Sequence, residues 1–547
     1  MADDVKQRIA SLFPRMQDVP VEADFAPSGG SYERGVEYLV DGEIRTWKGE
    51  MGQVLSPVCI AGPTGLARRP IGPDARLSRE EALVALDAAL RAWDHGRGAW
   101  PTMRVGERVE RLATFVALMR GVREESVRLL MWEIGKSRAD SEKEFDRTVQ
   151  YVVDTIEALK EIDRAGSRFS SNAGVLAQIR RSPLGVVLCM GPFNYPLNET
   201  FTTLIPALAM GNTVVAKLPR FGALCQAPLL GCFAESFPPG VVNIVNGAGR
   251  EVAGPIVETG AIAALAFIGS SRAANILKRQ HHMPNRLRCI LGLDAKNPAI
   301  VLDDADLDLA VAECVTGALS FNGQRCTALK MLFVQRRIAE AFVARLADAV
   351  DALSFGMPWQ PGVRITPLPE PDKVELMRQL VHDATSRGAK VANAHGGLAN
   401  ESFYYPAVVY PVTPAMRLYT VEQFGPVVPV AVFDDVAEVF RYVMESTYGQ
   451  QASVFGADPR RIGSLVDVLA NQVCRVNLNA QCQRGPDVYP FTGRKDSAEA
   501  TLSVSDALRC FSIRSMVAAP ETGPNKELLG EMLRRRSSNF VNTDYLF

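Results

Sequence analysis

The sequence predicts an α/β protein with a doubly wound parallel sheet in one domain and a second α/β domain after it. Between about residue 182 and residue 295, short unbroken apolar runs alternate with segments of helical length. The same alternation begins again near Asn297. Strands buried on both faces are continuously apolar, and helices connect such strands in parallel order. A chain of 547 residues is long enough for two or more domains.

The N-terminal part is predicted to be mainly helical. Residues 1–35 are polar and interrupted by Gly and Pro, which predicts an arm wrapped over the surface. Residues 38–47 read as a hairpin with an Asp41-Gly42 turn. Ser78 opens a capping box in front of apolar residues spaced by three and four, which predicts a helix. Further helices are expected at 105–121, 123–134 and 138–162.

The first alternating region contains the strands and helices of the doubly wound sheet. Its predicted strands are 183–192, which is closed by a turn, 213–216, 241–245 and 264–267, and its predicted helices are 224–237 and 250–258. Such sheets bind ligands beyond the carboxyl ends of their strands. The second region has predicted strands at 299–302, 332–334, 407–409 and 428–433, with helices at 307–321, 338–353, 371–387 and 435–443.

A polar strand pair at 165–181 is predicted to leave its domain and to pair with strands of a partner chain around 501–520. The chain then ends in a basic helix, 525–536, and a polar tail. The expected division is an N-terminal arm (1–35), a dinucleotide-binding domain (40–164 with 182–295), a catalytic domain (296–500), and an oligomerisation hairpin with a C-terminal extension (165–181 with 501–547).

Composition argues against several classes of function. The formal net charge of −1 gives no footprint for nucleic acid. No apolar run reaches the roughly 20 residues that a membrane span needs, and the N-terminus has no secretory pattern. The ten cysteines form no C-x-x-C pair, and the five histidines have no metal-ligand spacing. We therefore expect no metal site, reduced thiols and a cytoplasmic protein.

Cys326 is the candidate nucleophile. It follows Gly323-Gln324-Arg325 at the end of an apolar run. A thiolate is the strongest side-chain nucleophile near neutral pH, and the nearby glycine allows close approach of backbone to a substrate. The Cys326 N–H could donate to an oxyanion formed on the attacked carbon. For a lone cysteine, a buried structural role is the alternative.

Other motifs, in order along the chain, favour the catalytic interpretation. They are Pro192-Phe193-Asn194-Tyr195-Pro196, Gly211 to Lys217, Phe267-Ile268-Gly269-Ser270, Gly323 to Ala328, and Glu422-Gln423-Phe424-Gly425-Pro426-Val427. Together they resemble the aldehyde dehydrogenase superfamily from about residue 39 to residue 511. The resemblance implies that Cys326 attacks an aldehyde, that hydride passes to NAD(P), and that water hydrolyses the thioacyl-enzyme. Asn194 would be the second oxyanion donor.

The resemblance also implies a cofactor site. Its expected residues are Pro192, Lys217, Arg220, Gly249, Gly269, Ser270, Glu422 and Phe424. Lys217 would bind the adenosine ribose, Glu422 the nicotinamide ribose, and Phe424 would pack beside the nicotinamide. Arg220 stands where relatives that prefer NAD often have Glu. A guanidinium pairs well with a phosphate, so we expect NADP, with NAD possible.

Within the superfamily the resemblance is strongest to the non-phosphorylating, NADP-dependent glyceraldehyde-3-phosphate dehydrogenases. It rests on Asn194-Tyr195-Pro196, on Arg325, and on Arg484-Gly485-Pro486-Asp487. The residues expected to bind the substrate and its phosphate are Arg147, Tyr195, Arg325, Thr327 and Arg484. A dianionic group needs two or three guanidinium partners in one pocket. A homodimer or homotetramer is implied as well.

The chain departs from the family at one position. Most relatives have Glu-Leu-Gly-Gly-Lys, and their Glu activates the deacylating water; here the stretch reads Gly292-Leu293-Asp294-Ala295-Lys296. A glycine cannot act as a general base. Asp294 or Glu422 could replace the missing carboxylate, and Asp294 is the candidate we favour. The alternatives are a CoA-acylating semialdehyde dehydrogenase, or a catalytically impaired oligomer that binds nucleotide.

Overall fold

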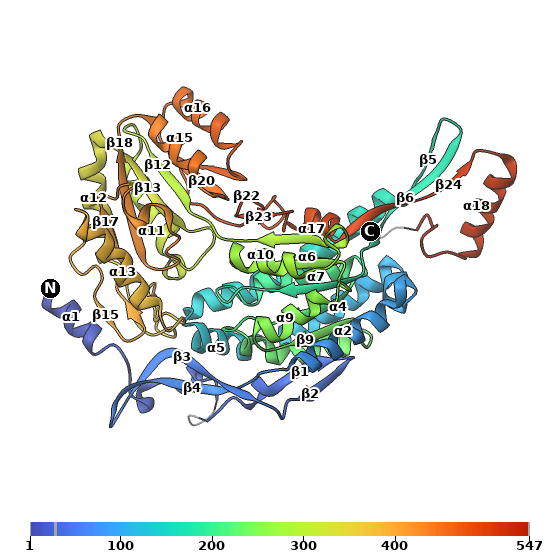
Figure 1. Cartoon of the computed structure of the whole chain (residues 1–547), viewed down its shortest axis with the longest axis horizontal. Helices are drawn as coiled ribbons and strands as arrows, with labels where there is room; N and C mark the ends of the chain where they lie inside the picture. The colour runs from blue at the N-terminus through green and yellow to red at the C-terminus, as the bar shows by residue number, and fades with distance from the viewer. Residues whose placement is uncertain (1, 27–29, 545–547) are drawn as a thin grey trace.

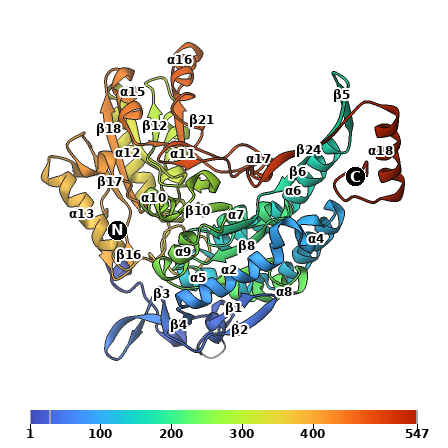
Figure 2. The same ribbon diagram turned by 45° about the vertical axis from the view of Figure 1, so that its right-hand side comes forward.

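Two parallel-rich sheets with helices around them confirm the predicted α/β class (Figures 1 and 2). The computed structural model describes residues 2–26 and 30–544. The first sheet has the strand order β2-β1-β9-β8-β7-β10-β11-β23. Its strands are β1 (Glu37–Val40), β2 (Glu43–Thr46), β7 (Val186–Met190), β8 (Thr213–Lys217), β9 (Val242–Val245), β10 (Ala264–Ile268), β11 (Arg288–Gly292) and β23 (Ala498–Glu499).

Alternate residues of strand β7 show why this sheet is covered on both faces. Val186 and Leu188 pack in the apolar cluster that contains α2 (Arg79–Trp93) and α9 (Gly249–Glu258). Val187 packs in the cluster on the opposite face. The helices of that opposite face are α4 (Val105–Gly121), α5 (Arg123–Ile134), α6 (Arg138–Gly166), α7 (Asn198–Ala209) and α8 (Leu230–Ser236). A strand buried on both faces is expected to be apolar throughout.

Local sequence signals set the bounds of several helices. The Ser78 hydroxyl accepts a hydrogen bond from the Glu81 N–H and begins α2, as the capping box predicts. Gly135 ends α5 in the left-handed region, with a φ of 67°. α6 runs four residues beyond its predicted end, to Gly166.

The second sheet carries the loop of Cys326, the predicted nucleophile, and has the strand order β14-β17-β18-β13-β12-β20-β21. Its strands are β12 (Asn297–Val301), β13 (Leu329–Gln335), β14 (Lys390–Val391), β17 (Ala407–Tyr410), β18 (Val427–Phe433), β20 (Gln451–Phe455) and β21 (Arg475–Leu478). The helices packed on it are α11 (Leu307–Leu319), α12 (Arg336–Asp351), α13 (Lys373–Ser386), α15 (Val436–Glu445) and α16 (Pro459–Leu469). Sequence analysis did not predict β20, which pairs with β12 in parallel.

The strand pairing of the predicted oligomerisation hairpin differs from the prediction. β6 (Val175–Pro183) pairs with β5 (Phe169–Asn172) and with β24 (Ser512–Pro520) of the same chain, so pairing with residues 501–520 of a partner is wrong. The physical reason is the return of the chain through α17 (Val504–Cys510). Its end is held against the first domain by Asn212, whose Nδ2 donates to the Phe511 carbonyl at 2.9 Å.

Both ends of the described chain contact the body of the protein. α1 (Ala2–Ala10) reaches the second domain, where Asn400 Nδ2 donates to the Ile9 carbonyl at 2.8 Å. The predicted arm and tail include residues 1, 27–29 and 545–547, which lie outside the described residues. At the C-terminal end, α18 (Gly523–Arg535) lies beside the far end of the three-stranded sheet (Figure 1).

An unpredicted hairpin, β3 (Met51–Gly62) with β4 (Gly65–Ala75), runs along the base of the molecule (Figure 1). No described helix is long and apolar enough to cross a membrane. Among residues 2–26 and 30–544, no group of His, Cys, Asp or Glu is arranged to hold a metal ion.

Candidate active site

Cys326 lies on a loop between α11 and β13 whose backbone is tightly constrained. Phe321, Asn322 and Gly323 have successive φ values of 47°, 55° and 72°. A Cβ at Gly323 would stand 2.7 Å from the carbonyl oxygens of Ala318 and Gly425, so only glycine fits there. Asn322 Oδ1 accepts the N–H of Thr366 at 3.0 Å and fixes this turn to a neighbouring loop.

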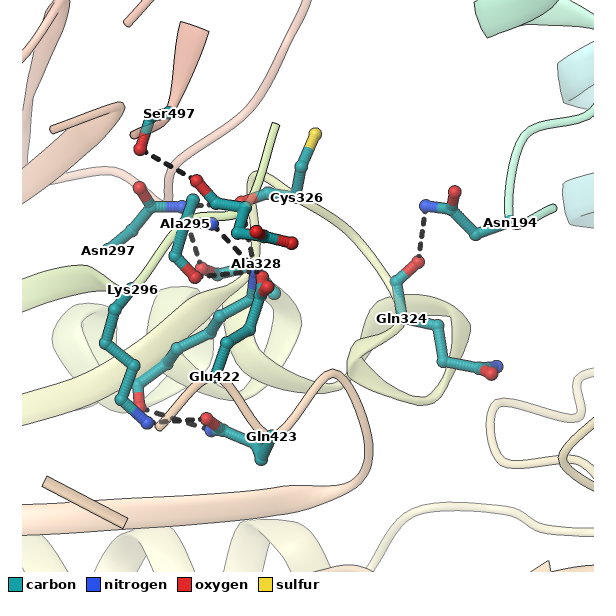
Figure 3. A network of polar contacts seen from close by, with 12 residues as sticks. Asn194, Ala295, Lys296, Asn297, Gln324, Cys326, Ala328, Glu422, Gln423 and Ser497 are labelled. Atoms are coloured by element: carbon teal, nitrogen blue, oxygen red, sulfur yellow. Dashed lines mark hydrogen bonds and ion pairs between the residues drawn. The ribbon is translucent and has the colours of Figure 1, made fainter. Parts of the chain in front are cut away.

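Side chains from the second sheet hold the carbonyls around the cysteine. Asn297 Nδ2 donates to the carbonyls of Cys326 and Ala328 at 2.8 and 3.0 Å (Figure 3). Lys330 Nζ also donates to the Cys326 carbonyl, at 3.2 Å. Figure 3 shows the Cys326 thiol directed away from these contacts. Burial raises the pKa of the Cys326 thiol, and the charge of Glu199 raises it further.

Asn194 belongs to the first domain and faces the cysteine loop from the opposite side. Its side chain is 5% exposed, and its Nδ2 donates to the Gln324 carbonyl at 2.8 Å, two residues before the cysteine (Figure 3). The Asn194 carbonyl accepts from Lys136 Nζ at 2.8 Å. Lys136 in turn forms an ion pair with Glu144, and both side chains are fully buried. The amide donor is therefore held by both domains.

One cavity of about 610 Å³ joins most of the predicted site residues. Those that line it are Arg147, Pro192, Asn194, Tyr195, Gly269, Ser270, Asp294, Arg325, Cys326, Thr327, Glu422, Phe424 and Arg484. They come from both domains, with α6 and α7 on one side and the nucleophile loop on the other. A cavity between domains with a few convergent polar groups is the usual form of a small-molecule site.

Lys217, Arg220 and Gly249 do not line this cavity. Lys217 ends β8; burial lowers its pKa to about 8, and no described side chain forms an ion pair with it. Arg220 is exposed, with its guanidinium 5.2 Å from the centre of the Phe221 ring. Gly249 begins α9, and a Cβ there would meet no atom within 4 Å. The neighbourhood of β8 and α9 thus offers two cationic groups that form no ion pair with a described carboxylate, and an open helix start, which fits an anionic dinucleotide.

The remaining cofactor candidates meet at the edge of the first sheet. Ser270 caps α10 (Ser271–Gln280), since its hydroxyl accepts the Ala273 N–H at 3.3 Å. The Gly269 N–H donates to the Gly292 carbonyl at 3.0 Å. On the facing side, Glu422 forms an ion pair with Lys330 and accepts the Ala295 N–H at 3.3 Å.

Two of the three predicted phosphate-binding arginines meet on one carboxylate. Arg147 makes a two-point contact with Asp487, with Nε–Oδ2 and Nη2–Oδ1 distances of 2.8 and 2.6 Å. Arg484 Nε lies 3.2 Å from the same carboxylate. Arg484 also forms an ion pair with Glu199, and both of these side chains are more than nine-tenths buried.

Arg325 lines the same cavity and forms no ion pair with a described carboxylate. Its Nη2 donates to the Gly317 carbonyl at 2.9 Å, and its Nε has no partner among the described residues. Tyr195 is held by Lys136, whose Nζ lies 3.7 Å from the centre of the ring. Burial raises the pKa of Tyr195, so its hydroxyl stays protonated near neutral pH.

Gly292 and Asp294 line the cavity from the end of β11. A Cβ at Gly292 would lie 3.1 Å from Leu502 Cδ1 and 3.4 Å from Ile268 Cγ1. Asp294 is the predicted base, but its Oδ2 accepts the backbone N–H of Ser271 at 2.8 Å, at the start of α10. That contact gives Asp294 a structural task and leaves its catalytic role a prediction.

Glu199 was not predicted from the sequence, and no role was predicted for Asp487. Glu199 lies in the first turn of α7, four residues after Tyr195, so helical spacing from the recognised motif could have indicated it. Nothing local indicates its partner, because Arg484 is 285 residues away in sequence.

The comparisons with known proteins agree with the resemblance seen in the sequence motifs. The model of the aldehyde dehydrogenase family matches residues 66–517. The chain belongs to the aldehyde dehydrogenase family. It is therefore an oxidoreductase that acts on aldehydes, as its sequence predicted.

Among curated relatives of this aldehyde dehydrogenase are two described as NADP-dependent glyceraldehyde-3-phosphate dehydrogenases. The one from Streptococcus equinus is 32% identical over 457 residues, covering 83% of this chain and 92% of that protein. The one from Pisum sativum is 30% identical over 483 residues, covering 87% and 93%. A crystal structure of the enzyme of that name from Bacillus halodurans, complexed with NADP, matches with a TM-score of 0.81 and 30% identity, covering 89% of this chain and all of that one.

Proposed function

We propose that this aldehyde dehydrogenase uses NADP to oxidise a small anionic aldehyde, glyceraldehyde 3-phosphate or a similar phosphorylated compound, to the carboxylic acid. The observation that carries the proposal is a single cavity lined by the nucleophile Cys326, the amide of Asn194 and three arginines. The relatives described as NADP-dependent glyceraldehyde-3-phosphate dehydrogenases support both the cofactor and the substrate class.

The first step of the proposed reaction is attack of the Cys326 thiolate on the aldehyde carbon. The oxygen of the resulting thiohemiacetal carries negative charge, which the Asn194 amide and the Cys326 N–H stabilise as donors. Both groups are held in advance, Asn194 by its contacts to Lys136 and Gln324 and the cysteine loop by Asn297. Donors that need no reorganisation stabilise the transition state more than mobile ones.

NADP, when bound, accepts hydride from this carbon. Lys217 would bind its adenosine ribose, and Arg220 the 2′-phosphate that distinguishes NADP from NAD. The absence of an ion pair on either residue among the described side chains supports this assignment. Glu422 and Phe424, on the facing loop, would position the nicotinamide ribose and ring. Oxidation of the thiohemiacetal leaves a thioacyl group on Cys326.

The anionic end of the substrate would lie among Arg147, Arg325 and Arg484, with Tyr195 and Thr327 beside it. Asp487 and Glu199 neutralise part of the charge of two of these arginines, whereas Arg325 contacts only neutral acceptors. The cluster therefore keeps a net positive charge. Guanidinium groups recognise phosphate and carboxylate oxygens by paired hydrogen bonds.

A second candidate function is transfer of the acyl group to coenzyme A. Gly292 favours it, because the residue that would activate water in most of the family is absent. The two candidates differ in the acyl acceptor and share every earlier step.

Rapid mixing of the pure protein with glyceraldehyde 3-phosphate and NADP, with and without coenzyme A, tests these proposals. We expect a burst of NADPH of about one per site followed by steady turnover without coenzyme A. A burst that stalls until coenzyme A is added would indicate the second candidate. No burst with any aldehyde would reject oxidation and leave only nucleotide binding. Tighter use of NAD than of NADP would reject the cofactor assignment.

We also propose that the enzyme is a homodimer or homotetramer. The three-stranded sheet β24-β6-β5 extends away from the body of the molecule (Figure 1) and exposes Ile513, Met516 and Val175 by 45%, 61% and 41%. Apolar side chains gathered on one projecting sheet favour burial against another chain. A monomer at micromolar concentration in analytical ultracentrifugation would contradict this.

A further inference from the structure

The structure offers a replacement for the carboxylate that Gly292 lacks. Six acidic side chains line the cavity that contains Cys326: Asp140, Glu144, Glu199, Asp294, Glu370 and Glu422. A carboxylate of this chain that acts as base for the deacylating water is expected in this set, because the water must reach the thioacyl carbon on Cys326.

Contacts assign most of these carboxylates to other tasks. Three form ion pairs with lysines: Glu144 with Lys136, Glu370 with Lys373, and Glu422 with Lys330. Glu144 also accepts the N–H groups of Leu197 and Asn198, so its second oxygen is occupied. Asp140 accepts the Ser137 hydroxyl at 3.0 Å near the start of α6.

Asp294 already makes a structural contact at the start of α10. Its carboxylate accepts the Ser271 N–H at 2.8 Å. Burial raises the pKa of Tyr448 to about 12, and the charges of Glu422 and Asp294 add to that effect, although Tyr448 does not line this cavity. The carboxylate whose charge raises the pKa of the Cys326 thiol is Glu199.

Glu199 also has the surroundings of a proton acceptor. It is 6% exposed, and burial raises its pKa above that of an ordinary glutamate although the charges of Arg484 and Arg147 oppose the shift. Arg484 holds one oxygen, Oε2, and cannot take the proton itself. The other oxygen, Oε1, has no hydrogen-bond partner among the described residues, and the side chain borders the cavity. Glu199 follows the oxyanion donor Asn194 by five residues, at the start of α7.

We propose that Glu199 is the general base of deacylation in this enzyme and takes over the task for which Gly292 has no side chain. This inference rests on the proposed function only in requiring a thioacyl group on Cys326. In the step, Glu199 takes a proton from water as the water oxygen bonds to the thioacyl carbon. The carbon–sulfur bond then breaks, releasing the carboxylic acid, and the proton held by Glu199 returns to the Cys326 thiolate.

An activated ester, 4-nitrophenyl acetate, tests this step without an aldehyde or NADP. Acylation of Cys326 releases 4-nitrophenolate as a burst, and the later steady release measures deacylation. For Glu199→Gln we expect a full burst and a steady rate lowered by about 10²–10⁴-fold. The acetyl group should then remain on Cys326, detectable as an added mass on the intact protein. Glu142→Gln, on α6 and outside the cavity, is the matched loss of a carboxylate and should behave as the unchanged enzyme.

Two further variants separate catalysis from folding. Glu199→Asp keeps a carboxylate beside Arg484 and should retain a measurable part of the steady rate. Glu199→Gln combined with Gly292→Glu should recover it, because a carboxylate returns to the position used by the family. The steady rate of the unchanged enzyme should rise with pH through one ionisation that Glu199→Gln removes.

The outcomes of the ester test can be told apart from those of the test of the proposed function. An unchanged steady rate in Glu199→Gln, or a loss found in Asp294→Asn instead, would overturn the assignment of Glu199. The absence of any ester burst in the unchanged enzyme would overturn it too. A normal ester cycle with no NADPH from any aldehyde would reject the proposed oxidation and leave the role of Glu199 intact.

Discussion

Replacing Lys136 by Met should uncouple the oxyanion donor from its support. The Lys136 ammonium is fully buried, forms an ion pair with Glu144, and donates to the Asn194 carbonyl at 2.8 Å. Glu144 extends the network to the start of α7, where its Oε1 accepts the Leu197 N–H at 3.0 Å. The substitution removes the charge that compensates Glu144 and releases the loop that carries Asn194.

The expected magnitudes follow from this burial. Removing one partner of a buried ion pair leaves an uncompensated charge and costs about 3–5 kcal/mol of folding free energy. A displacement of about 1 Å at a catalytic group lowers the rate by about 10²-fold. Glu144→Gln keeps an acceptor for α7 but removes the second charge. The double variant Lys136→Met with Glu144→Gln should therefore be less destabilised than Lys136→Met alone.

Urea unfolding, monitored by circular dichroism, measures the loss of folding free energy. The rate of the NADPH burst measures the loss of catalysis. Exposed ion pairs contribute about 0–1 kcal/mol, so a loss within that range for Lys136→Met would refute the reasoning from burial. Additive effects in the double variant would show that the two side chains act independently. A burst rate unchanged in Lys136→Met would refute the role of Lys136 in positioning Asn194.

Three other predictions concern single contacts. Asn194→Ala should lower the rate of the NADPH burst by about 10²–10³-fold with little change in NADP binding, and an unaffected burst would exclude it as an oxyanion donor. Because burial lowers the pKa of Lys217 to about 8, its ammonium form is lost as pH rises through that value. The Kd for NADP should increase above pH 8, and Lys217→Gln should abolish that dependence in fluorescence titrations. Asn297→Ala removes the hydrogen bonds to the Cys326 and Ala328 carbonyls and should lower both the unfolding midpoint and the burst rate. Unchanged hydrogen-exchange rates in the cysteine loop would contradict this.

Local signals along the chain predicted much of the fold. Short apolar runs predicted the central strands because both faces of a doubly wound sheet are buried, as the alternation of Val186 and Val187 between two clusters shows. The Ser78 cap and the left-handed Gly135 set helix ends that depend only on neighbouring residues. β20 was not predicted, because its first residue, Gln451, is polar and yet buried, with its Nε2 donating to the distant Gln483 carbonyl at 2.9 Å.

The candidate site likewise has residues that the sequence indicated and contacts that only the structure showed. The motifs around Cys326, Asn194, Glu422 and Arg484 were found from the sequence because each is a short run of specific residues. Gly292, at the position where the resemblance leads us to expect a glutamate, was also found there. The presence of Glu199 beside Arg484 was not, since it depends on where α7 and the loop after β21 meet.

The sequence by itself determined the α/β class and the family, and it supplied the predictions of Cys326 as nucleophile and of Gly292 in place of the usual base, because these depend on local pattern and residue identity. The tertiary structure decided which strand pairs with β6, which carboxylates Arg147 and Arg484 contact, and which acidic side chain is available near Cys326. Each of these depends on residues hundreds of positions apart. Their proximity is set by how the two domains pack, and no local signal carries that information.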